Sequence, residues 1–306
     1  MRNIKQDAET QDAGRGFGSG APRGFVSHYT FYIIHSPFAF VRHLALALAA
    51  LATLMPFFVM LLFSLKDFAQ TSWSFWSPPS PWRWENYGFA LKASGAYVGN
   101  SLIVSAGACS LALLAAVPAA HAFSALAAKW SSRAYALVVA MLMVPNILLL
   151  VPLFLVTRSL GLLDSYLGLI LPQAAGMLPV TIFLLKESFD GIPRDLFDAA
   201  RIDGAGEARV IAHIVVPMSM PIFSSVCILN LLASWNNYVW PLITTQTPAL
   251  RTIPLGLAFL VTEQNLMFEP GKLMATYAVA SVPLVVFFLI AMKPFVRGLA
   301  SGALKE

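Results

Sequence analysis

One polar segment of this sequence lies between long apolar runs. It runs from Asp198 to Pro217 (DAARIDGAGEARVIAHIVVP), in a chain of which only 11% of the residues are charged. The pattern predicts two short helices around a turn at Asp203-Gly204, because glycine tolerates a positive φ. So short an element cannot bury its own apolar face, which begins just upstream with Leu196 and Phe197 and continues through Ala200 and Ile202. The chemistry that this segment offers is therefore the binding of a partner that covers it.

A second group of polar residues lies inside or at the ends of apolar runs. These side chains would be costly facing lipid, so we expect them to face a helix bundle or a cavity. In one stretch, aromatic rings flank paired amides. Such rings can cover the apolar faces of a neutral, hydroxyl-rich ligand, and the amides can form hydrogen bonds with its hydroxyls. The alternative is an aromatic belt at the membrane interface with amides that cap a helix end. The candidate residues of a solute path are Asn146, Gln173, Asn230, Ser234, Trp235, Asn236, Asn237 and Trp240.

Motifs for catalysis and for cofactor binding are missing from the sequence. The phosphate-binding pattern G-x-x-x-x-G-K-[ST] is absent, since Gly271-Lys272 is followed by Leu273. No His/Cys cluster has metal-ligand spacing. Cys109 and Cys227 lie inside apolar runs, where we interpret them as small packing residues rather than a disulfide or metal pair. We expect no catalytic residue, no metal and no cofactor bound by this chain, and hence no enzyme.

The elements that must position these residues are membrane helices. The chain of 306 residues is 58% hydrophobic with a mean hydropathy of +0.71, well above soluble domains. Its net charge of +5 therefore reports membrane orientation rather than affinity for nucleic acid. About 20 apolar residues cross a bilayer core. Six segments qualify as spans: 43–65, 100–122, 134–157, 166–187, 213–235 and 273–293.

Several features refine this membrane prediction. The apolar stretch 253–261 is too short to span, and we expect it in a folded loop outside the membrane. The tryptophan-rich stretch 73–84 fits the membrane interface, although a stacking platform for sugar is an alternative. Prolines favour kinks in the spans. They are Pro118, Pro145, Pro152, Pro172, Pro179, Pro221 and Pro283.

Lys and Arg predict the orientation of the spans. With the N-terminus inside, 14 of the 20 Lys and Arg lie in inner segments and the other 6 in outer ones. Both termini and the polar segment are then cytoplasmic. We expect a partly disordered cytoplasmic tail over 1–42, a transmembrane domain over 43–293 with the polar loop at 190–217, and a cytoplasmic tail over 294–306.

The polar segment resembles the EAA loop of ABC importer permeases. That pattern is an acidic residue and two alanines, three residues, a glycine, nine residues and then Ile-x-Leu-Pro. Asp here replaces the usual Glu, and Val replaces the usual Leu. The spacing is matched by Asp198-Ala199-Ala200, Gly204 and Ile214-Val215-Val216-Pro217.

Beyond this loop the chain resembles the carbohydrate-importing, maltose-transporter-type branch of these permeases over roughly residues 43–306. The supporting stretches are 100–102, 235–242 and 295–305. The resemblance implies the type I importer fold, an all-α polytopic membrane protein. Six transmembrane helices are expected, with a cytoplasmic coupling helix between the fourth and fifth. It implies a permease subunit of the bacterial inner membrane that imports sugars or oligosaccharides.

The resemblance also implies partners. These are a second similar permease, two ATP-binding cassette subunits that use ATP and Mg, and an external solute-binding protein, which the loop 244–272 would face. Alternatives are the same architecture importing glycerol phosphate, a polyol or an acidic oligosaccharide, or a secondary carrier. No charged residue lies near a predicted midplane, which weakens the carrier hypothesis. The expected ATPase-coupling residues are Leu196, Phe197, Asp198, Ala199, Ala200, Arg201, Asp203 and Gly204.

Overall fold

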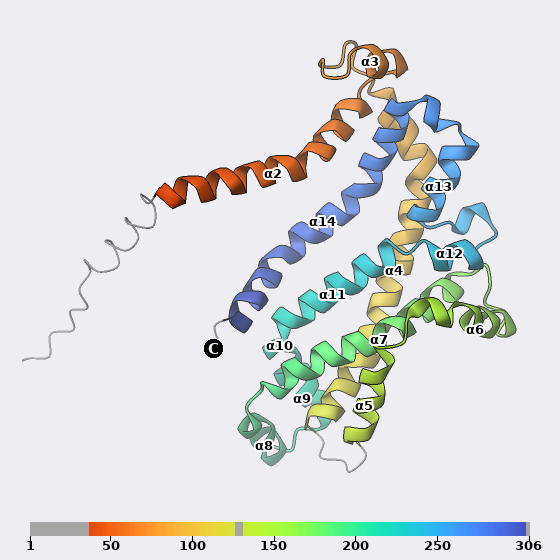
Figure 1. Cartoon of the computed structure of the whole chain (residues 1–306). Helices are drawn as coiled ribbons and strands as arrows, with labels where there is room; N and C mark the ends of the chain where they lie inside the picture. Colours follow the sequence, from red (N-terminus) through yellow and green to blue (C-terminus); the bar gives the residue numbers. More distant parts are fainter. Residues whose placement is uncertain (1–36, 126–130, 304–306) are drawn as a thin grey trace, which may run out of the picture. The chain divides into compact units, whose positions relative to one another are not determined.

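The structure is a computed structural model that describes residues 37–125 and 131–303 (Figure 1). Throughout this described part the regular elements are helices, which confirms the predicted all-α class. The N-terminal tail predicted over 1–42 lies almost entirely outside it. The chain divides into two units, residues 1–58 and 59–306, and each is described by itself.

The long helices share an apolar composition. They are α2 (Pro37–Ser64), α4 (Glu85–Ala125), α7 (Tyr166–Asp190), α11 (Met220–Trp235) and α14 (Pro270–Ala303). The shorter helices form the connections and two broken segments. They are α3 (Phe68–Trp73), α5 (Ser131–Met141), α6 (Asn146–Ser159), α8 (Arg194–Ile202), α9 (Glu207–Val210), a π-helical turn (Ile211–Val215), α10 (Val216–Met218), α12 (Val239–Thr244) and α13 (Ile253–Glu263).

The first unit contributes the larger part of α2. Its side chains from Phe40 to Phe58 are exposed, and most of them are apolar. Such a helix needs lipid or another protein to cover it. The span observed over Phe40–Ser64 agrees with the first predicted span, 43–65.

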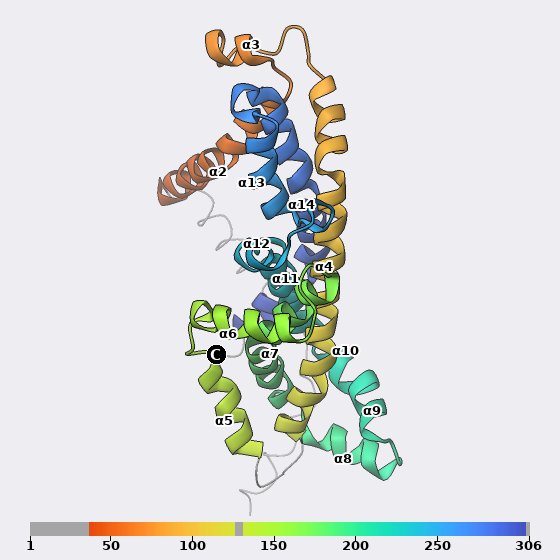
Figure 2. The ribbon, with the colours of Figure 1, turned by 90° about the vertical axis from the view of Figure 1, so that its right-hand side faces the viewer.

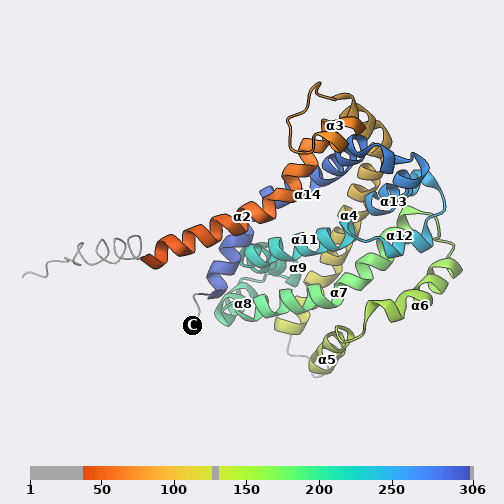
Figure 3. The ribbon, with the colours of Figure 1, turned by 45° about the horizontal axis from the view of Figure 1, so that its top comes forward.

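In the second unit, α4 is the central element. It packs most extensively on α7 and also contacts α11 and α14 (Figures 1 and 3). One side of α4 carries alanine at every fourth position, Ala108, Ala112, Ala116 and Ala120, and all four are fully buried. Residues four apart share one helix face, and such small side chains let neighbouring helices approach closely. The core of this unit therefore runs along α4.

The two ends of α4 meet different loops. At one end, the amide of Asn86 donates to the backbone oxygens of Ser64 and Lys66, at 2.9 and 3.0 Å. This ties α4 to the segment that carries α3 and the exposed side chains of Trp82 and Trp84. At the opposite end lie α8 and α9 (Figure 2). The polar loop and the tryptophan-rich loop are thus on opposite sides of the unit, as the predicted topology requires.

The number of continuous spans is smaller than predicted. Among the described residues, four helices are long and apolar enough to cross a membrane: α2, α4, α7 and α14. The predicted spans 134–157 and 213–235 are each broken, with bends of 102° between α5 and α6 and 86° at Ser219. Six spans result only if each bent pair is one span. The polytopic prediction is confirmed, and the count of six stays a prediction.

Proline explains the position of both breaks. Pro145 is extended and directly precedes α6, and a proline disfavours the helical conformation of the residue before it, here Val144. Ser219 lies between Pro217 and Pro221, which lack the N–H groups that a continuous helix would use. The other predicted kink sites lie inside helices that continue through them: Pro118, Pro152, Pro172, Pro179 and Pro283.

Two further expectations concern the C-terminal third. The stretch predicted as too short to span forms α13, an apolar helix of 11 residues that packs on α4. The boundary predicted at 293/294 does not coincide with a helix end, because α14 continues to Ala303.

Candidate functional site

The polar loop folds as predicted, as a short helix that ends at a glycine turn. Gly204 has φ +72°, the left-handed conformation that favours glycine. The N–H of Ala205 donates to the Ala200 oxygen at 2.9 Å, and the N–H of Gly204 donates to the Arg201 oxygen at 3.0 Å. These two bonds are those of a Schellman cap, which satisfies the last carbonyls of α8. Pro193 occupies the N-cap position of α8, which begins at Arg194.

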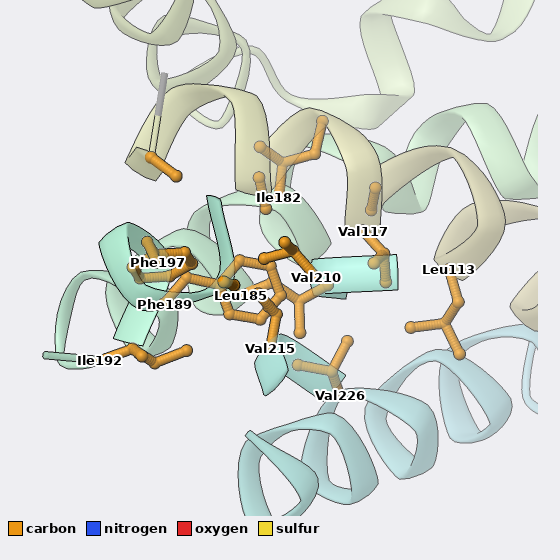
Figure 4. Close-up of a cluster of buried hydrophobic side chains, with 14 of the residues drawn as sticks. Leu113, Val117, Ile182, Leu185, Phe189, Ile192, Phe197, Val210, Val215 and Val226 are labelled. Atoms are coloured by element: carbon orange, nitrogen blue, oxygen red, sulfur yellow. The ribbon is translucent and has the colours of Figure 1, made fainter. Parts of the chain in front are cut away.

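One face of α8 is buried against this chain's own helices. Phe197 and Ala200 belong to an apolar cluster with Leu185 and Phe189 of α7, and Val210 extends it (Figure 4). From the sequence we expected a partner protein to cover the whole apolar face. The structure places Phe197 and Ala200 inward, because the bundle's end offers an apolar surface of its own.

The outward face of α8 holds the remaining predicted coupling residues. Leu196 is 39% exposed, and the neighbouring Ile202, which is outside the predicted set, is 86% exposed. An exposed isoleucine beside charged groups is an apolar contact site for another protein, because no part of this chain that the structure describes covers it. The other exposed residues of the predicted set are Asp198, Ala199, Arg201, Asp203 and Gly204.

Polar contacts fasten the loop to the end of α4. His121 of α4 is 2% exposed, and its Nε2 lies 2.8 Å from Oε2 of Glu207, the first residue of α9. Because a carboxylate only accepts, Nε2 donates. Arg201 lies 3.9 Å from the other Glu207 oxygen, and Arg194 donates to the Ser124 oxygen at 3.2 Å. The loop is therefore held to α4 as well as joined to α7 and α11.

Three predicted path residues meet in the seam between α7 and α11. The hydroxyl of Ser234 donates to the Gln173 side-chain oxygen at 2.9 Å. The amide of Asn230 donates to the Thr181 hydroxyl at 3.0 Å. All four side chains are buried and uncharged. Such bonds hold membrane helices together, so in this chain alone Gln173, Asn230 and Ser234 join two helices.

The other five predicted path residues differ in how far their side chains are exposed. Trp235 is buried against Phe287, and the indole N–H of Trp240 donates to the Gly168 oxygen at 2.9 Å. Asn237 is half-buried and its side-chain oxygen accepts from the Trp240 N–H, which is helix capping. The amides at the ends of helices that stay exposed are Asn146 and Asn236.

A second polar cluster fixes the loops at the opposite end. The carboxylate of Asp164 accepts from the Thr247 hydroxyl and from the N–H groups of Thr247 and Gln246. These bonds hold the pKa of the Asp164 carboxyl below its usual range. Asn100 of α4 donates to the oxygens of Ala249 and Arg251, at 2.7 and 2.9 Å. The segment from 244 to 253 is therefore anchored to two other parts of the unit.

Sequence reasoning missed His121, Glu207, Thr181 and Asp164 as site residues. His121 and Glu207 are 86 positions apart, and Thr181 and Asn230 are 49 apart. No local spacing links such pairs. The one usable signal was a titratable or polar side chain inside or beside an apolar run, which by itself names no partner.

Comparison with known proteins gives concordant results. The model of a family described as "Binding-protein-dependent transport system inner membrane component" matches residues 112–301. The chain is 32% identical over 281 residues to the arabinooligosaccharides transport system permease protein AraQ of Bacillus subtilis, covering 89% of this chain and 99% of that one. It is 32% identical over 269 residues to the sulfoquinovosyl glycerol transport system permease protein SmoH of Agrobacterium fabrum, covering 87% and 93%.

A solved structure shares the fold. It is a chain of a bacterial ABC transporter involved in the import of the acidic polysaccharide alginate. The TM-score is 0.72 at 21% sequence identity, with 84% of this chain and 95% of that chain covered.

Proposed function

Because this chain belongs to the family of binding-protein-dependent transport system inner membrane components, we propose that it is the permease subunit of an ATP-driven importer of neutral sugars or oligosaccharides. As a member of that family it is a multi-pass protein of the bacterial inner membrane and a transport component rather than an enzyme. Its partners in the proposal are a second permease, two ATPase subunits that bind ATP and Mg, and an external solute-binding protein.

The observation that carries the coupling role is the two-sided packing of α8. Its inner face, with Phe197, is buried against α7, while Ile202 and Leu196 remain uncovered on the outer face. An ATPase groove that holds this outer face would move α8 and the bundle's end together, because both form one packed cluster. Two packed states of similar energy, each favoured by a different nucleotide state, then give alternating access.

The proposed orientation places α8 in the cytoplasm and the Asp164–Thr247 cluster outside. This assignment rests on the excess of Lys and Arg in the segments on the side of α8. It also sets the segment from 244 to 253 where a solute-binding protein would dock. A rigid docking surface lowers the entropy cost of binding, and the anchoring by Asn100 and Asp164 provides that rigidity.

The proposal of a neutral solute is supported by the sequence of the predicted spans, which places no charged residue near a predicted midplane. An anionic solute crossing this chain would call for basic groups beside its path. An acidic saccharide is the second candidate, because SmoH and the alginate transporter are named for such cargo. In that case the second permease would supply the positive charge.

Uptake in cells tests the proposal. The gene for this chain is deleted and restored, and uptake of labelled neutral oligosaccharides, glycerol 3-phosphate and oligo-alginate is compared. We expect uptake of a neutral oligosaccharide to be lost on deletion and to require the ATPase. Loss of oligo-alginate or glycerol phosphate uptake alone would assign the anionic alternative. Uptake that persists without the ATPase would contradict the importer and favour a secondary carrier.

A further inference from the structure

The two cysteines of the chain, far apart in sequence, meet within the bundle. Cys109 of α4 and Cys227 of α11 have their Sγ atoms 3.6 Å apart, and Cys109 Sγ also lies 3.7 Å from the Cys227 backbone oxygen. From the sequence alone we interpreted both as small packing residues rather than as a disulfide or metal pair. Sulfur atoms in this contact need to approach by about 1.5 Å to reach the disulfide bond length near 2.05 Å. Bond formation therefore requires side-chain rotation or a helix shift of that size.

The two thiols differ in access. Cys109 is 3% exposed, in the interior against α7 and α11. Cys227 is half-buried and lines an apolar groove of about 300 Å³ between α11 and α14, with Phe223 and Leu231 on one wall and Leu284 and Phe287 on the other. In the predicted six-span topology, both helices of this groove belong to membrane spans. Apolar molecules dissolved in the bilayer can therefore reach Cys227 first, whereas polar oxidants from water are excluded from so apolar a wall.

We propose that Cys109 and Cys227 form a redox-modification site that a lipid-soluble hydroperoxide closes to an intrachain disulfide between α4 and α11. In the first step, Cys227 Sγ attacks the terminal peroxide oxygen and the O–O bond breaks. The thiol proton passes to the departing oxygen, which leaves as an alcohol, and Cys227 becomes a sulfenic acid. In the second step, Cys109 Sγ attacks that sulfur. The S–O bond breaks, and the hydroxyl leaves with the second thiol proton as water.

The position of the pair gives the cross-link a mechanical effect. α11 is joined to the coupling loop through the 86° break at Ser219, and Cys227 lies eight residues further along. A movement of the loop that shifts α11 against α4 must therefore shift Cys227 against Cys109. A covalent bond there prevents this shift, so the oxidised protein should be trapped in one arrangement. This last step rests on the proposed function as an importer permease.

The chemical part is tested on the full transport complex in lipid nanodiscs. The complex is treated with cumene hydroperoxide, digested with trypsin without reductant and analysed by mass spectrometry. Trypsin cuts after Arg133 and Arg209, between the cysteines. We expect a peptide pair that joins Cys109 to Cys227, is two hydrogens lighter than the separate peptides and is split by dithiothreitol. Hydrogen peroxide at the same concentration should give much less of it.

Single substitutions test the order of the steps. In Cys109→Ser, Cys227 should still be oxidised but stay a sulfenic acid, which dimedone traps. In Cys227→Ser, the interior Cys109 should give little dimedone product. A wild-type complex without the linked peptides, or one in which Cys109 is trapped and Cys227 is not, would overturn the site.

The functional part uses the same complex in proteoliposomes. Cumene hydroperoxide should remove most solute uptake by the wild type, dithiothreitol should restore it, and Cys109→Ser should be resistant. Full uptake by a complex whose cysteines are mostly linked would overturn the mechanical effect and leave the thiol chemistry standing. Absence of uptake before any treatment would instead count against the proposed function, since the linked peptides are detected independently of transport.

Discussion

His121 Nε2 lies 2.8 Å from Glu207 Oε2, and this contact joins the C-terminal end of α4 to the loop proposed to meet the ATPase. The imidazole is almost fully buried, whereas the carboxylate is about half exposed. Its other ring nitrogen, Nδ1, has no hydrogen-bond partner among the residues that the structure describes. Glu207 is therefore the hydrogen-bond partner of the His121 side chain, through Nε2, within the described residues.

Removing Glu207 should weaken both the fold of the loop and its coupling. In Glu207→Ala the buried Nε2–H loses its acceptor, and an unsatisfied buried donor costs about 1–3 kcal/mol. Solute-stimulated ATP hydrolysis by the reconstituted complex should fall. Glu207→Gln is the matched control, because its amide oxygen still accepts from Nε2, and it should keep most of the stimulation. If Ala and Gln variants behave alike, the contact does not transmit movement.

Gly204 should tolerate no side chain, for reasons of backbone conformation alone. A Cβ there meets no atom within 4 Å, but the φ of +72° costs other residues on the order of 1–2 kcal/mol. Gly204→Val should therefore insert into the membrane yet lose its hold on the ATPase, measured by copurification. Gly206→Ala is the control, because Gly206 has φ −72° and equally open surroundings. Equal copurification by both variants would contradict the role of the turn.

Asp164 should make the protein sensitive to acid. Its pKa is lowered by the Thr247 hydroxyl and by backbone N–H groups, so the folded state binds the proton less readily than the unfolded chain does. This contribution to stability is fully present above the unfolded pKa near 3.9 and is lost as pH falls through the lower folded pKa. Thermal unfolding followed from pH 6 down to pH 2 should show a loss that Asp164→Asn reduces. An identical acid profile for the variant would refute the assignment.

Asn230 and Asn236 should respond differently to alanine. Asn230 is buried and bonded to Thr181, and hydrogen bonds between membrane helices average about 0.6 kcal/mol. Asn230→Ala should therefore lower the unfolding temperature. Asn236 is exposed at the end of α11, so Asn236→Ala should leave that temperature unchanged and reduce solute uptake. Normal uptake by Asn236→Ala would assign this amide to capping.

Local patterns in the sequence predicted the features that depend on neighbouring residues. The turn at Gly204, the apolar helices and the short length of α13 all follow from composition or spacing within a few residues. The breaks at Pro145 and Ser219 were harder to predict, since five other prolines that we expected to kink the spans stay inside continuous helices. Whether a proline breaks a helix depends on how surrounding helices satisfy the freed backbone groups.

Contacts between distant segments could not be predicted from this one sequence. His121 and Glu207, Cys109 and Cys227, and Asp164 and Thr247 are each separated by more than 80 residues. The inward placement of Phe197 has the same cause, because it depends on the apolar end of α7. The amphipathic pattern of α8 shows that one face is buried and gives no information about which surface covers it.

The length of α4 has a consequence for how the protein fits different membranes. A helix of 41 residues is about 60 Å long, roughly twice the thickness of a bilayer's hydrocarbon core. A thicker or thinner bilayer therefore changes how much of α4 lies in water and how far α4 tilts, at a modest free-energy cost per ångström of mismatch. The separation between Asn86 and His121 along α4 stays the same. Bilayer thickness should accordingly alter the height of both loops above the lipid without changing the distance between them.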